Sequence, residues 1–202
     1  VIFRFFSSPK RVVILEKRLK CFEDLDDELK ERTAVIYSGC SINIVNQKRI
    51  AISLPKIKGR IKDSIREGVI STIPSTFFLP RFVLKKYNLK FDESFSSFVD
   101  HDFLLKLAES DLHMYYVNEP LSKTYAYPAK KSMVTDVDKR IKYIKQLKEK
   151  WDDFLHSIMP LTSYNKFITT YVANEYSNLI MNSIISKDFS TSYKILSSLK
   201  IG

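Results

Sequence analysis

Apolar residues recur at helical spacing near the start of the chain and again over its last third. Between residues 11 and 31, charged residues separate an apolar set that falls on one face of a helix: Val12, Leu15, Leu19, Phe22 and Leu25. From Thr135 or Asp136 the same period predicts a long helix, whose apolar stripe is Val137, Ile141, Ile144, Leu147, Trp151 and Phe154. Two more helices are expected after it, one over 163–186 and one from Ser190.

The middle of the chain changes to β-rich runs broken by turn-forming residues. Residues 33–38 (TAVIYS) and 41–46 (SINIVN) flank Ser38-Gly39, which predicts two strands or a hairpin. We expect a basic connector to follow, through Arg66. Residues 71–79 predict a buried strand, which Pro74 confines to an edge or an irregular geometry.

Further elements follow at short intervals. A short helix is expected over 81–87, beginning at or just after Pro80. A second helix is expected from about Asp100 to Glu109, and a strand over 113–118 that Pro120 ends. The first part of the chain is therefore predicted to be mixed α/β and the rest helical. The boundary falls in the loop 128–134, which gives domains over 1–130 and 131–202.

Composition narrows the class of protein. Hydrophobic residues make up 45% of the 202, so a sizeable core is available and general disorder is excluded. Cys21 and Cys40 lack metal-ligand spacing and are too few for a disulfide scaffold, which makes a reducing compartment the default. No apolar run approaches the roughly 20 residues that span a bilayer, so the chain is expected to be soluble or peripheral to a membrane.

The net charge of +10 is concentrated in the first half of the chain. Its densest tract lies between residues 56 and 66, where Asp63 is the only acid among Lys56, Lys58, Arg60, Lys62 and Arg66. Such a tract favours polyanions such as nucleic acid, anionic lipid headgroups or phosphorylated ligands. A solvated basic face explains it equally well. No nucleic-acid-binding motif accompanies the charge, so nucleic acid is not an expected partner.

Several short motifs follow one another without a gap in the middle of the chain. They are Pro74-Ser75-Thr76, Arg81, Phe91-Asp92-Glu93, Asp100, Asp102, Lys106-Leu107 and Pro120-Leu121. In this order they resemble the acceptor-side half of family 2 glycosyltransferases of the GT-A fold. The C-terminal helices are similar to those that follow such domains in polysaccharide-type members. The resemblance implies part of a Rossmann-like, three-layer α/β domain followed by a helical extension.

The resemblance also implies site residues. An inverting sugar transfer needs a carboxylate to take the proton of the acceptor hydroxyl, and the family's catalytic Asp maps onto Asp100. By position alone, Asp100 is instead a helix-capping residue. Ser75, Thr76 and Asp102 would line the acceptor site. Arg81, Asp92 and Glu93 belong to the structural part of the motif, while His101 and His113 are expected to be ordinary, partly buried histidines.

The sequence departs from the family pattern at three places. Val99 stands where the family has Glu before the catalytic Asp, and Tyr127 stands where a metal-binding His is often found. The family's Asp-x-Asp signature would fall on 5–7, which reads Phe-Phe-Ser. The complete family domain is expected to use Mg²⁺ or Mn²⁺, but no ligand for either is identifiable in this chain.

The segment that would bind the uracil and ribose of the donor has no counterpart in this sequence. A truncated or frame-shifted reading of the gene would explain both this and the missing signature. The codons of Ile2-Phe3-Arg4, read one base along, can encode Phe-Leu-Asp, the usual end of the family's metal strand.

The expected function is therefore that of an inverting, hexosyltransferase-type glycosyltransferase. It would move a sugar from a nucleotide-diphosphate sugar to a glycan or lipid-linked acceptor in polysaccharide biosynthesis of the cell envelope. The expected location is cytoplasmic, peripheral at the inner face of the membrane. The alternative is a catalytically inactive, glycosyltransferase-like binding or interaction domain. A basic nucleic-acid-binding module is a third hypothesis, based on charge alone.

Overall fold

The computed structural model describes residues 9–44, 49–67, 76–95, 98–126, 137–185 and 189–198. The chain divides into two compact units. The first unit comprises Val1–Asn43, Ile50–Lys90 and Lys106–Thr124, and the second comprises Ile44–Arg49, Phe91–Leu105 and Tyr125–Gly202.

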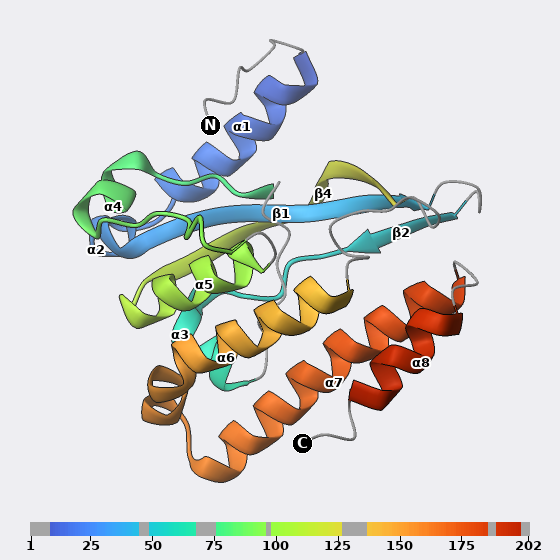
Figure 1. Cartoon of the computed structure of the whole chain (residues 1–202). Helices are drawn as coiled ribbons and strands as arrows, with labels where there is room; N and C mark the ends of the chain where they lie inside the picture. Colours follow the sequence, from blue (N-terminus) through green and yellow to red (C-terminus); the bar gives the residue numbers. More distant parts are fainter. Residues whose placement is uncertain are drawn as a thin grey trace. The chain divides into compact units, whose positions relative to one another are not determined.

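A four-stranded sheet and short helices make up the first unit (Figure 1). The strand order is β2-β1-β4-β3. The strands are β1 (Thr33–Ile44), β2 (Arg49–Ser53), β3 (Gly59–Arg60) and β4 (His113–Ala126), and the helices are α1 (Pro9–Glu23), α2 (Asp27–Arg32), α3 (Ile61–Arg66) and α4 (Arg81–Lys86). The buried apolar side chains of this unit include Val35, Ile36, Ile57, Ile61, Ile65, Leu112 and Met114.

Three long helices dominate the second unit: α6 (Val137–Ile158), α7 (Leu161–Ile185) and α8 (Phe189–Ser198). Figure 1 shows α7 and α8 side by side, and the Ser183 and Ser192 hydroxyls lie 2.6 Å apart between them. The stripe predicted for α6 packs inward at Ile144, Leu147 and Trp151. A further helix, α5 (Val99–Glu109), contributes its residues up to Leu105 to this unit and its last turn to the first.

At the level of fold class the sequence prediction is confirmed: a mixed α/β region is followed by helices. The helix predicted after Pro80, the helix from about Asp100 and the three C-terminal helices are present. The predicted boundary at 128–134 lies outside the described residues, and so does most of the strand predicted over 71–79. Phe78, at the end of that segment, forms an isolated antiparallel bridge with Ile36.

The turn predicted at Ser38-Gly39 is wrong, because β1 runs through both residues without a break. Gly39 is needed there for close approach of the neighbouring backbone. A Cβ at this position would lie 2.8 Å from the Ser53 carbonyl oxygen and 3.0 Å from that of Glu119. A glycine inside a strand therefore marks strand crowding here, where the sequence suggested a turn.

The helical spacing over 11–31 is confirmed but divided between two helices, since α1 ends at Glu23 and α2 begins at Asp27. Asp26 starts the second helix by accepting the Leu29 N–H on its Oδ1 (2.7 Å), as an N-cap does. The apolar face predicted for α1 stays largely exposed at Leu15 and Leu19. Arg18 is buried instead, and its Nη2 donates to Ser38 Oγ (2.8 Å) and Ser122 Oγ (3.1 Å) on β1 and β4.

Two further expectations are corrected. The connector through Arg66 contains β3 and α3, and β4 does not end at Pro120 but continues to Ala126. The short strand β3 pairs only with His113 and Met114, so beyond them β4 is paired on its β1 side alone within the described sheet. Proline is tolerated at such an edge, because its missing N–H leaves no ladder bond unmade.

Candidate functional site at the start of helix α5

The first turn of α5 carries Asp100, His101 and Asp102 directly after a strained residue. Phe98 has φ +62°, a left-handed conformation that is rare for a bulky side chain and costs on the order of 1–3 kcal/mol. The Asp102 N–H donates to the Phe98 carbonyl (2.9 Å) and closes the turn. Backbone strain of this kind is concentrated at functional sites, which makes this turn a candidate functional site.

Aromatic contacts support the turn from α7. His101 Nδ1 lies 2.8 Å from the Tyr171 hydroxyl. The Phe98 ring packs against His101 (centroids 5.2 Å apart) and against Tyr171 (6.4 Å). Tyr171 therefore contacts both the first and the last residue of the Phe98–His101 turn. Asp100, inside the turn, remains half-exposed.

Asp102 lies in a different environment although it is only two residues away. It is 0% exposed, and its Oδ1 accepts the indole N–H of Trp151 (2.9 Å) and pairs with Lys150 Nζ (2.6 Å). Both partners come from α6, so this carboxylate fastens α6 to the first turn of α5. A buried carboxylate needs such partners because its loss of hydration costs several kcal/mol.

Lys150 extends the network to a second carboxylate. Its Nζ also lies 2.6 Å from Asp92 Oδ2 and 5.1 Å from the centre of the Phe95 ring. Burial alone would lower the pKa of Lys150, but hydrogen bonds to Asp102 and Asp92, together with their charges, outweigh burial and raise it. Lys150 is thus a firmly charged bridge between the two aspartates.

Asp92 closes the turn that precedes the site. Its Oδ1 accepts the Ser94 N–H (2.9 Å) while its Oδ2 binds Lys150. The hydrogen bond from Lys150, followed by that from Ser94, holds the pKa of the Asp92 carboxyl well below its usual range. Glu93 lies exposed in the same turn.

The remaining predicted site residues belong to the first unit. Thr76 is 0% exposed, Arg81 is the exposed first residue of α4, and Ser75 lies outside the described residues. Within the second unit, the structure brings Asp92 and Asp102 together through Lys150. The acceptor contacts that the resemblance implies for Ser75, Thr76 and Asp102 stay predictions.

Sequence reasoning missed Lys150, Trp151 and Tyr171 as parts of this region. The sequence pattern places Trp151 only in the apolar stripe of α6, and nothing in it distinguishes Lys150 from the other lysines. Asp102 and Trp151 lie 49 residues apart, and no local pattern links them. Only the packing of α6 on α5 reveals the connection.

The described residues contain no group of three or more His, Cys, Asp and Glu side chains that could hold a metal ion. The positions that correspond to the family's metal ligands, 5–7 and Tyr127, lie outside the described residues. The part of the chain that is described therefore shows no donor set for the Mg²⁺ or Mn²⁺ that the resemblance implies.

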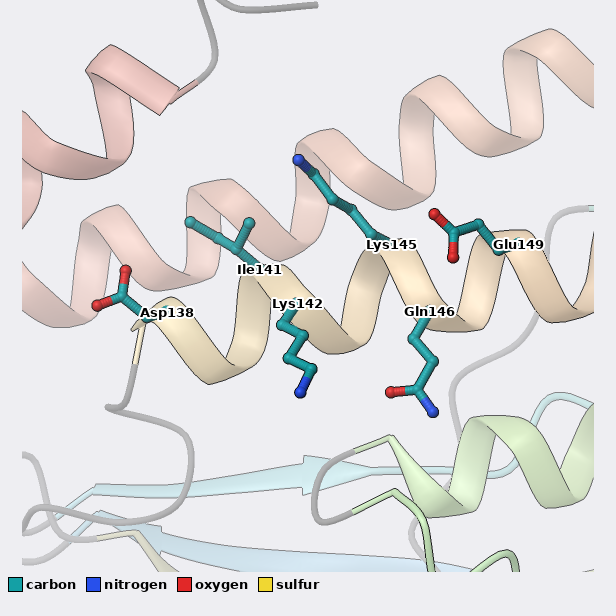
Figure 2. Close-up of a pocket in the computed structure, with 6 residues that line it drawn as sticks. All are labelled: Asp138, Ile141, Lys142, Lys145, Gln146 and Glu149. Carbon is teal, nitrogen blue, oxygen red and sulfur yellow. The ribbon is translucent and has the colours of Figure 1, made fainter.

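A shallow hollow of about 510 Å³ lies along α6, away from the turn of Asp100 in sequence. It is lined by Asp138, Ile141, Lys142, Lys145, Gln146 and Glu149. Figure 2 shows Ile141 and Lys145 pointing to one side of the helix and Lys142 and Gln146 to the other. These side chains diverge and carry mixed charge, so the hollow lacks the converging polar groups of a catalytic pocket.

Comparisons with known proteins identify no relative of this chain. No family model matches it, and neither a curated protein nor a solved structure matches it significantly. Among the described residues, no helix is both long enough and apolar enough to cross a bilayer.

Proposed function

We propose that this chain is the acceptor-side portion of an inverting, family-2-like glycosyltransferase with Asp100 as its general base. The observation that carries the proposal is the contrast between two aspartates of one helical turn. Asp102 is buried and paired with α6, whereas Asp100 is half-exposed on the same turn. A general base must reach a substrate hydroxyl, and of these two carboxylates Asp100 is the accessible one.

The proposed chemistry is a single displacement at the anomeric carbon of a nucleotide-diphosphate sugar. Asp100 accepts the proton of the acceptor hydroxyl as its oxygen attacks, and the bond to the nucleoside diphosphate breaks on the opposite face. The strained Phe98 and the Asp102–Lys150 pair support this role, because they fix the turn on which Asp100 lies. Positioning of this kind lowers the entropic part of the barrier.

The proposal concerns the acceptor side. The donor sugar, and the Mg²⁺ or Mn²⁺ that the family resemblance implies, would be held by residues outside those the structure describes. A glycan or lipid-linked acceptor at the inner face of a cell membrane fits the net charge of +10, since anionic headgroups attract basic surfaces. The GT-A fold itself is part of the proposal.

Replacing Asp100 tests the assignment, and the chain offers a matched control. Val99-Asp100 begins α5 and Val137-Asp138 begins α6, so each aspartate is the second residue of its helix. In the complete domain, Asp100→Asn should lower turnover by about 10²–10⁴-fold, the usual contribution of a general base, and leave donor binding intact. Asp138→Asn should leave turnover nearly unchanged. Near-full transfer by the Asp100→Asn enzyme, measured with labelled nucleotide-sugars, would refute the proposal.

A non-catalytic glycan-binding or interaction domain is the second candidate. Val99 favours it, because the glutamate that precedes the base in the family is absent. Under this hypothesis the complete domain binds glycans without transferring sugar, and Asp100→Asn changes neither property. Glycan binding without turnover in the unmodified protein would select this candidate.

A further inference from the structure

A second aspartate cluster lies in the first unit, at the end of α5. Asp111 has φ +54° and follows the helix in a C-terminal capping motif, with Asp111 N–H donating to Ala108 O (3.0 Å) and Leu112 N–H to Leu107 O (3.0 Å). Glycine, or less often asparagine, is usual at this position, and Asn88 occupies the equivalent position after α4 with φ 49°. An aspartate here holds its carboxylate just beyond the end of the helix.

Three cations from different elements converge on this carboxylate. Arg32 Nη2 of α2 lies 2.6 Å from Asp111 Oδ2, and Arg60 Nη2 of β3 lies 2.9 Å from Oδ1. Lys62 Nζ of α3 lies 3.8 Å from Oδ1. One carboxylate has about four lone-pair sites, whereas two guanidinium groups and an ammonium carry many more donors. Donor capacity therefore remains on side chains that are 39% exposed at Arg32 and 44% at Arg60.

The charge balance around Asp111 is positive. Arg66 joins the group through Asp63 (3.0 Å), which also lies 3.8 Å from Arg60. Counting four cations (Arg32, Arg60, Lys62, Arg66) against two carboxylates (Asp63, Asp111) leaves an excess of two positive charges. Like charges held this close repel each other, and a bound anion would relieve that repulsion.

A buried histidine lies beside the same cluster. His113 is the cross-strand partner of Arg60 in the β3–β4 pair, so both side chains project from the same face of the sheet. It is only 8% exposed, and neither ring nitrogen has a hydrogen-bond partner among the described residues. Burial, followed by the charge of Arg32, lowers the pKa of His113, which leaves a neutral ring with one unused donor.

We propose that Arg32, Arg60 and Lys62 bind a phosphate group at this cluster, with the His113 ring as a further donor. Two guanidinium forks and an ammonium suit the oxygens of a phosphate monoester or diphosphate, which arginine binds in bidentate fashion. The phosphate is carried either by a free small molecule or by the headgroup of an acidic phospholipid. This site is independent of Asp100, so it stands whether or not the chain is a glycosyltransferase.

The test compares two variants of one helix. Arg32→Gln removes a cation from the cluster, whereas Lys30→Gln removes one from an exposed pair with Asp27 on the same turn of α2. Binding is measured by calorimetry with pyrophosphate, and by sedimentation with phosphatidylcholine vesicles that contain phosphatidic acid. Arg32→Gln, and likewise Arg60→Gln, should weaken binding about tenfold or more, while Lys30→Gln should change it less than about twofold.

A variant that is expected to bind more tightly distinguishes loss of a phosphate contact from loss of folding. Asp111→Asn keeps a residue that tolerates the left-handed conformation, as Asn88 shows, but removes the competing carboxylate. It should strengthen pyrophosphate and vesicle binding several-fold. Unfolding would not produce such a gain.

Two patterns support the proposal and identify the source of the phosphate. Binding of pyrophosphate with weak vesicle binding indicates a free phosphorylated ligand, and binding only to phosphatidic acid vesicles indicates a lipid headgroup. The proposal is overturned if neither probe binds, if Lys30→Gln weakens binding as much as Arg32→Gln, or if Asp111→Asn leaves binding unchanged.

Discussion

Two aspartate clusters of this protein differ in their balance of charges and in the burial of their central carboxylate. In the Asp102 cluster (Asp92, Asp102, Lys150 and Trp151) the central carboxylate is 0% exposed and one lysine serves two acids. In the Asp111 cluster (Arg32, Arg60, Lys62 and Asp111) the central carboxylate remains 31% exposed and three cations surround it. The first has one cation for two carboxylates and is closed at its centre, since Asp102 is fully buried, while the second has positive charge in excess and is open at its centre, since Asp111 is partly exposed.

This difference in burial separates a cluster that stabilises the fold from one whose donors are accessible to a ligand. A closed pair must stay intact, because removal of one partner leaves an uncompensated charge in a dry environment. An open cluster contributes little to folding, because water and salt screen its charges. The same exposure leaves its donors available to a ligand.

Lys150→Met should have the largest effect on stability. Methionine keeps the length of the side chain but leaves Asp102 buried without its lysine, which we expect to lower the free energy of unfolding by roughly 2–3 kcal/mol. This is below the usual cost for a fully buried pair because the Lys150 side chain is 31% exposed. Urea unfolding measures the loss, and Trp151, the only tryptophan, reports it by fluorescence.

Lys148→Met provides the control, because Lys148, two residues before Lys150 on α6, forms an exposed (i, i+4) pair with Asp152. It should cost less than about 0.5 kcal/mol. Adding Asp102→Asn to Lys150→Met should restore part of the lost stability, since the unpaired charge is then gone. Equal losses in the two lysine variants would show that the buried pair has no special role.

Local patterns predicted the helices well and the course of the strands less well. The apolar period along 137–158 identified α6, because a helix buries a stripe that its own sequence defines. Gly39 and Pro120 misled the prediction for opposite reasons: Gly39 is accommodated by closely approaching neighbouring backbone, and Pro120 lies where β4 has lost its β3 partner. Whether a glycine or a proline interrupts a strand depends on the neighbouring strands of the sheet, and the sequence of the strand itself does not specify these.

The candidate site shows the same limit. Asp100 and Asp102 were placed correctly at the start of a helix, as acidic residues in a first turn suggest. Their opposite environments were not predictable, because burial of Asp102 depends on Lys150 and Trp151 of a distant helix. Likewise, the dense basic tract around Arg60 was visible in the sequence, but its convergence with Arg32 on Asp111 was not.

Arg32→Gln tests how little the open Asp111 cluster contributes to stability. The side chains of Arg32 and Asp111 are 39% and 31% exposed, so their ion pair is discounted for solvent screening. We expect the free energy of unfolding to fall by less than about 1 kcal/mol, although phosphate binding falls about tenfold. A loss as large as that of Lys150→Met, in the same urea titration, would place the Asp111 cluster among the structural pairs.

Asp92→Asn should have the smallest effect, and one that depends on pH. Because Lys150 and Ser94 hold the pKa of Asp92 below its unfolded value of about 3.9, the carboxylate stabilises the fold above that pH. As the pH falls below about 4 and approaches the depressed value, this contribution is lost. Urea unfolding at a series of pH values measures this. The difference in unfolding free energy between the unmodified protein and Asp92→Asn should be constant between pH 5 and 7 and should become smaller in acid.

In a Lys150→Met background this decrease in acid should be much weaker, because the main cause of the Asp92 pKa shift has been removed. A difference that stays constant down to pH 2 would mean that Lys150 binds Asp102 alone in solution, and that the closed cluster has one acid, not two.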